Sequence, residues 1–140
     1  MSLSIYQRHL DTIPKQYQLL KLFRPPIYVI ELSNNQVSAV CYYKDGSSKR
    51  HQVNAAFSNR RMVIADFLSA VQAITDLLLK FPKHPFGISS FAVVNVTEEL
   101  IDGLTMIEIK AIREAVWAAS GQAKRRIVSS IVSYQGQVVS

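Results

Sequence analysis

The sequence has little of what several protein classes require. It contains one cysteine, Cys41, so no internal disulfide can form and a reducing compartment is the simplest expectation. No apolar run approaches the ~20 residues of a membrane span, and residues 1–10 lack the apolar centre of a signal peptide. The histidines, His9, His51 and His84, have no Cys or His at metal-ligand spacing. We therefore expect a cytoplasmic protein with no transmembrane segment and no metal site.

What the sequence does contain is typical of one globular domain. Hydrophobic residues make up 49% and charged residues 19% of the 140 positions, which suits a folded chain with a sizeable core. Cys41 lies in an apolar strand pattern, which favours a buried and inert thiol.

Positive charge exceeds negative charge, but it is scattered. Sixteen Lys and Arg against ten Asp and Glu give a net charge of +6. The densest groups are Lys49–Arg50, Arg60–Arg61 and Lys124–Arg125–Arg126, each beside an expected strand or helix end. The simplest interpretation is a solvated rim. If folding gathers the groups on one face, they predict a contact patch for nucleic acid phosphates.

The first 26 residues read as an N-terminal extension that packs on the core. Apolar residues recur at helical spacing, at Leu10, Ile13, Tyr17, Leu20 and Phe23. Pro14 disfavours one long helix, so we expect a short helix that begins near this proline. Pro25–Pro26 then ends it.

Three strands with tight turns follow. Ile27–Leu32, Val37–Tyr43 and Lys49–Ala56 have strand composition. Ser33–Asn35 and Asp45–Gly46 are turn signals between them. These segments predict an antiparallel meander.

The apolar period then changes to that of a helix. Ile64, Phe67, Leu68, Val71, Ile74, Leu77, Leu78 and Phe81 mark one helical face. Asp66 suits the start of this helix, and Pro82 ends it. Ile88–Val96 follows as a strand whose continuous apolar run is typical of a strand covered on both faces.

A second helix is predicted from Thr105. Thr105 and Glu108 fit a capping box, and Gly121 is a natural C-cap. Ile109, Ile112, Val116 and Ala119 continue its apolar face, and we expect core packing for Trp117 as well as for Phe81. Arg126–Val132 reads as the next strand.

The resulting order, β-β-β-α-β-α-β, defines an α/β fold. We predict a mixed five-stranded sheet, formed by the three-stranded meander and two crossover strands, with helices packed on it. Nothing in residues 27–140 suggests a second domain.

Two stretches resemble the MreB branch of the actin/Hsp70/sugar-kinase superfamily. Met62–Phe67 is similar to the segment that leads into the first core helix of MreB proteins, and Thr105–Ala115 is similar to their Thr-x-x-Glu-x-x-Ala-Ile-Arg-Glu helix. The likeness spans roughly residues 27 to 133. It implies a ribonuclease-H-like, actin-like core that corresponds to the first core subdomain alone.

The resemblance also implies where a phosphate loop would lie. The family's Asp-x-Gly-Thr loop falls on Glu31, Ser33, Asn34 and Asn35 here, and its glycine is missing. The segment Ser129–Tyr134 lacks the carboxylates that MreB proteins carry after this strand, and few residues remain for a second half. We therefore expect a vestigial loop, no cofactor, no catalytic residues and no enzymatic activity.

The leading hypothesis is a non-catalytic, MreB-like interaction module that binds a protein partner or a second copy of itself. The assembly would be a bacterial cytoskeletal or envelope-associated one, with Tyr17, Leu20 and Phe23 laid over the place of the missing half. Two alternatives stay open: a basic nucleic-acid-binding module, and a nucleotide sensor that binds without hydrolysis.

Overall fold

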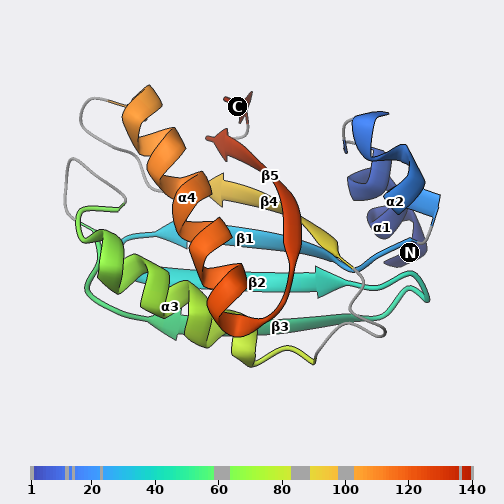
Figure 1. The fold of residues 1–140 in the computed structure, drawn as a ribbon, viewed down its shortest axis with the longest axis horizontal. Coiled ribbons are helices and arrows are strands. Elements are labelled where there is room, and N and C mark those ends of the chain that lie inside the picture. The colour runs from blue at the N-terminus through green and yellow to red at the C-terminus, as the bar shows by residue number, and fades with distance from the viewer. Residues whose placement is uncertain are drawn as a thin grey trace.

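A six-stranded mixed sheet forms the centre of the molecule (Figure 1). The computed structural model describes residues 2–11, 13, 15–22, 24–58, 64–82, 89–97, 103–135 and 137–139. The strands are β1 (Ile27–Ser33), β2 (Gln36–Tyr42), β3 (Ser48–Asn54), β4 (Ser90–Val96), β5 (Ile127–Tyr134) and β6 (Gln137–Val138). Their order is β3-β2-β1-β4-β5-β6.

The topology confirms the predicted α/β fold class, with one strand more than expected. β1, β2 and β3 pair antiparallel as a meander, and β4 and β5 add to β1 in parallel. The sixth strand is the short β6, which returns antiparallel along β5 after a turn in which Gln135 adopts a φ of 50°. Two residues of pairing are too short a signal to be seen in the sequence.

Both long helices, α3 (Phe67–Leu79) and α4 (Met106–Ala123), lie on the same face of the sheet (Figure 1). They share one core with the inward residues of the strands, including Tyr28, Ile30 and Leu32 of β1. Ile74 of α3 and Ile112 of α4 are fully buried in it. The helices therefore cover one side of the sheet only.

Helix α3 begins one residue after the acid that the sequence marks. The Asp66 carboxylate accepts a hydrogen bond from the Ser69 amide at 3.0 Å, and this bond lowers the pKa of Asp66. Phe67 and Leu68 were expected on the buried face, but both are exposed. They lie in the first turn after the cap, where the chain is only entering the helical layer.

Helix α4 starts as predicted and ends later. The Thr105 hydroxyl accepts from the Glu108 amide at 3.2 Å and donates to Glu108 Oε1 at 3.3 Å. Gly121 is not the C-cap, because the helix runs on to Ala123 and Lys124 takes the left-handed position with a φ of 56°. Its amide bonds to the Gly121 carbonyl and the Arg125 amide to the Ser120 carbonyl, which forms a Schellman motif.

The N-terminal segment differs from the expected single helix. It forms α1 (Ser2–Asp11), a 3-10 turn η1 (Lys15–Tyr17) and α2 (Gln18–Leu22), so most of its helix precedes Pro14. Tyr6, Leu10 and Ile13 form a second, smaller cluster with Ile27 and Phe91 at one end of the sheet. The Tyr6 hydroxyl donates to the Pro25 carbonyl at 2.7 Å. The side chain of Leu20 and all of Phe23 lie outside the described residues.

Cys41 is buried, as the strand pattern predicts. Burial raises the pKa of its thiol to about 12, although the neighbouring Tyr43 hydroxyl and Lys49 act in the opposite direction. A thiol in this environment stays protonated and unreactive at neutral pH.

Arg125 ties the ends of the two helices together. It was expected in a solvated rim, but its side chain is 7% exposed. Its guanidinium donates through Nη1 to the Ala123 carbonyl at 2.7 Å and through Nη2 to the Phe81 carbonyl at 2.6 Å. The physical reason for the burial is that both carbonyls end a helical segment and lack a partner within their own helix.

We predict that Arg125→Lys lowers the free energy of unfolding by about 1–3 kcal/mol, because an ammonium group cannot span both carbonyls. The neighbouring Arg126→Lys should change it by less than about 0.5 kcal/mol, since Arg126 is exposed. Urea denaturation of both variants measures the difference. Equal stabilities would contradict the assigned role of Arg125.

Candidate functional site

The face of the sheet opposite α3 and α4 carries a row of β-branched side chains. Strand pairing places Val29 beside Val40 and Val93, and Val93 beside Ile131. The row therefore crosses four strands, and each of its members is half-buried. The N-terminal segment covers this face only at its end, around Ile27 and Phe91. We call the four residues the open-face row.

The open-face row corrects one expectation. β4 was predicted to be covered on both faces because of its continuous apolar run, yet Val93 and Asn95 are half-buried rather than buried. Among the described residues, no helix lies over the row (Figure 1). The sequence thus carries apolar residues suited to a covered face, and the chain leaves that face uncovered.

A polar row borders the open-face row on the same face. Glu31 pairs with Ser38 on one side and with Asn95 on the other, and Asn95 pairs with Ser133. The Ser133 hydroxyl donates to the Asn95 amide oxygen. Glu31, the acid of the predicted phosphate loop, is thus an exposed member of this row.

The remaining residues of the predicted phosphate loop form the turn between β1 and β2. Asn35 adopts a left-handed φ of 53°, which asparagine tolerates. Its amide donates to Ser58 Oγ at 2.8 Å, and its side-chain oxygen accepts from the amides of Phe57 and Ser58 at 3.0 and 2.9 Å. The Ser58 hydroxyl also lies 2.9 Å from Asn34 Oδ1, and the Ser33 hydroxyl donates to Gln36 at 3.3 Å.

These contacts give the turn a structural task. It clamps the segment that follows β3, with an added bond from the Ala55 amide to the Asn35 carbonyl at 3.1 Å. The Asn35 amide, which a phosphate cradle would use, already has a protein acceptor. That Glu31, Ser33, Asn34 and Asn35 once held a phosphate stays a prediction.

The structure divides the predicted basic patch. Lys49 and Arg50 are exposed neighbours on β3 and therefore point to opposite faces of the sheet. Lys124 and Arg126 are exposed around the end of α4, with the buried Arg125 between them. Arg60 and Arg61 lie outside the described residues.

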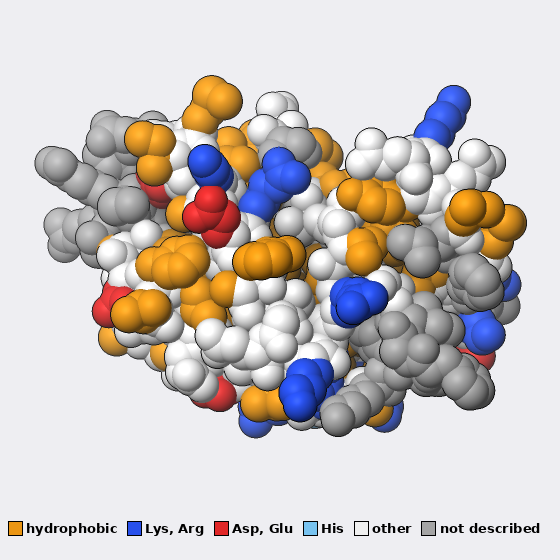
Figure 2. Space-filling view, viewed as in Figure 1, with side chains coloured by type: hydrophobic (Ala, Val, Ile, Leu, Met, Phe, Trp, Pro, Cys, Tyr) orange, Lys and Arg blue, Asp and Glu red, His pale blue; other side chains and the backbone are white. Residues whose placement is uncertain are grey.

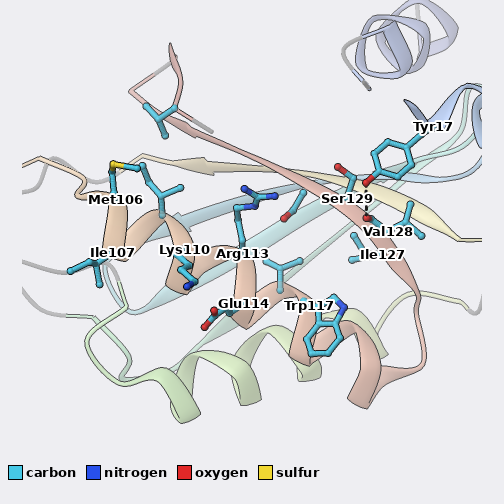
Figure 3. A pocket seen from close by; sticks show the side chains of 14 residues that line it. Tyr17, Met106, Ile107, Lys110, Arg113, Glu114, Trp117, Ile127, Val128 and Ser129 are labelled. Carbon is cyan, nitrogen blue, oxygen red and sulfur yellow. Dashed lines mark hydrogen bonds between the residues drawn. The ribbon is translucent and has the colours of Figure 1, made fainter. Parts of the chain in front are cut away.

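A groove lies between α4 and β5, and the sequence did not predict it (Figures 2 and 3). It encloses about 860 Å³, and its lining includes Tyr17 and Val139 beside the helix and the strand. On the helix side it is lined by Met106, Ile107, Ile109, Lys110, Arg113, Glu114, Val116 and Trp117, and on the strand side by Ile127, Val128, Ser129 and Ser130. We call it the α4–β5 groove.

Trp117 overturns a prediction, because it is 74% exposed and not part of the core. Met106 and Ile107 are 85% and 80% exposed on the same helix. A signal for this was present in the sequence. Trp117 directly follows the buried Val116, and one residue turns a helix by ~100°, away from the buried stripe.

The groove has a cationic rim. Lys110 and Arg113 are exposed, and within the described part of the chain neither has a hydrogen bond or an ion pair to a carboxylate. Figure 3 shows Arg113 extending from α4 toward β5, and Glu114 extending from another flank of the helix. Apolar side chains with charged groups among them are visible over α4 in Figure 2.

The described residues hold no group of three or more His, Cys, Asp or Glu that could bind a metal ion. In the same part of the chain, no helix is both long and apolar enough to cross a membrane.

Comparison with known proteins gives one structural similarity. No protein-family model matches the chain, and no curated protein matches it. Among solved structures, the ethanolamine utilization protein EutJ from Carboxydothermus hydrogenoformans matches with 15% sequence identity and a TM-score of 0.45. The match covers 78% of this chain and 37% of that protein.

We predict that Asn35→Gly lowers the free energy of unfolding by about 1–3 kcal/mol, because the amides of Phe57 and Ser58 lose their acceptor. Glycine keeps the left-handed backbone accessible, so the loss reports the hydrogen bonds alone. Asn35→Asp retains an acceptor and is the matched control, with a much smaller loss. Urea denaturation compares the two. A Gly variant as stable as the Asp variant would remove the clamp.

Proposed function

We propose that this chain is a non-catalytic interaction module that acts by protein–protein contact. The observation that carries the proposal is the open-face row, Val40, Val29, Val93 and Ile131, which lies in register across four strands and is half-exposed. The central strands pair in parallel, and parallel sheets are normally covered on both faces. A partner that covers this row would complete the sheet.

The use of the β1–β2 turn supports the non-catalytic part of the proposal. Phosphoryl transfer needs backbone donors that are free to cradle phosphate. Here the Asn35 amide and side chain bind the segment 55–58 instead. Nucleotide binding at this turn would have to break those bonds.

The partner that we propose first is a filament of an actin-like protein in a bacterial cytoskeletal or envelope-associated assembly. The basis is the similarity of the segment Thr105–Ala115 to the corresponding helix of MreB proteins. In this version the chain binds or regulates the filament rather than hydrolysing ATP itself.

Co-sedimentation with polymerised MreB tests the proposal. We expect the chain to pellet with the filaments, and Val29→Thr/Val93→Thr to reduce the pelleted fraction several-fold, because threonine keeps the β-branched shape but adds a hydroxyl to the row. Val138→Thr is the matched control, since Val138 is 69% exposed on β6, away from the row.

Two results would contradict the proposal. One is no pelleting of the unmodified chain at tens of micromolar; the other is equal pelleting of the row variant and the control. Calorimetry with Mg-ATP on the same preparation should give no heat of binding. A saturating signal would favour the nucleotide-sensor hypothesis instead.

A further inference from the structure

The α4–β5 groove has the shape for a rod-like occupant. It follows α4 from Met106 to Trp117, which is about 16 Å or three helical turns. Its floor near Trp117 is the start of β5, at Ile127 and Val128. α3 and α4 form a layer on this face of the sheet, and the groove is the next position in that layer.

An added β-strand would not fit at this edge. The outer edge of β5 is occupied at two places, because the Tyr17 hydroxyl donates to the Val128 carbonyl at 3.4 Å and the Val139 amide donates to the Val132 carbonyl at 2.8 Å. Alternate residues of a strand face the same edge, so only Ser130 lies between these anchored residues. A strand would have to displace both contacts, whereas a helix beside α4 would displace neither.

The charges of the groove select the chemistry of the occupant. Lys110 and Arg113 lie at its rim without a carboxylate partner among the described residues. The exposed apolar side chains of Met106, Ile107 and Trp117 lie along the same helix. Apolar centres with charged rims are the pattern of helix-in-groove recognition, and rim charges set partner choice.

We propose that the α4–β5 groove binds an amphipathic helix of a partner protein, with its apolar face on Trp117 and Ile107 and with Asp or Glu on its flanks against Lys110 and Arg113. This inference rests on the proposed function, namely that the chain is an interaction module. It adds a second surface, on the side of the sheet opposite the open-face row.

A display library of helical peptides tests this proposal. Each peptide carries leucine at the positions of one apolar face and a random choice of Glu or Lys at the flanking positions. Trp117 is the only tryptophan of the chain, so a blue shift of its fluorescence reports occupation of the groove directly. We expect selection on the unmodified chain to enrich Glu over Lys, and the selected peptides to shift the Trp117 emission.

Charge-reversal variants provide the control. Lys110→Glu/Arg113→Glu should weaken the selected peptides about tenfold or more. Lys49→Glu/Arg50→Glu makes the same change in net charge on β3 and should weaken them much less. The pair separates local recognition from attraction to the overall positive charge.

Four results would overturn the proposal: no enriched helix, enrichment of Lys, equal weakening by the two double variants, or a dimer in light scattering whose formation shifts Trp117 without peptide. The last result would assign the groove to a second copy of the chain. If the groove fails these tests while Val29→Thr/Val93→Thr still abolishes filament binding, the proposed function stands and only this inference is lost.

Discussion

The direction of the two crossover connections determines most of this structure. β3, β4 and β5 run parallel, and the chain moves across the sheet in the same sense from β3 to β4 and from β4 to β5. Right-handed crossovers in the same sense place both helices on the same face. One core therefore contains α3, α4 and half of the sheet, and the other half of the sheet has only the N-terminal segment against one end.

The exposed apolar surfaces follow from this arrangement. The open-face row exists because no helix of the described chain crosses over it, and the α4–β5 groove exists because two helices do not span six strands. Around these surfaces the backbone is well anchored. Arg125 joins the ends of the helices, Asn35 joins the β1–β2 turn to the segment after β3, and Tyr17 holds the N-terminal segment on β5. The scaffold presents its surfaces without further folding.

The parts of the fold that sequence could predict are those set by local chemistry. Thr105 and Asp66 marked helix starts because capping involves residues three apart, and the meander followed from its turn residues. Arg125, Lys124 and β6 could not be predicted, because each depends on contacts or strain that only the folded chain defines.

The candidate surfaces were missed for a related reason. The apolar residues of β4 looked like those of a strand buried on both sides, and only the register shows that Val93 shares an uncovered row with Val29, Val40 and Ile131. Trp117 was assigned to the core by residue type, although its position next to Val116 argued against this. Pattern identifies which residues are apolar, but topology decides which of them the chain covers.

The exposure of the open-face row is the central claim, and methyl NMR in the presence of a soluble gadolinium chelate measures it most directly. The chelate relaxes methyl groups according to their distance from solvent. We expect strong relaxation at Val29, Val40, Val93 and Ile131, and weak relaxation at Leu32, Ile74 and Ile112 in the covered core. Protection of the row equal to that of the core would show that the chain covers this face itself, and would contradict the account.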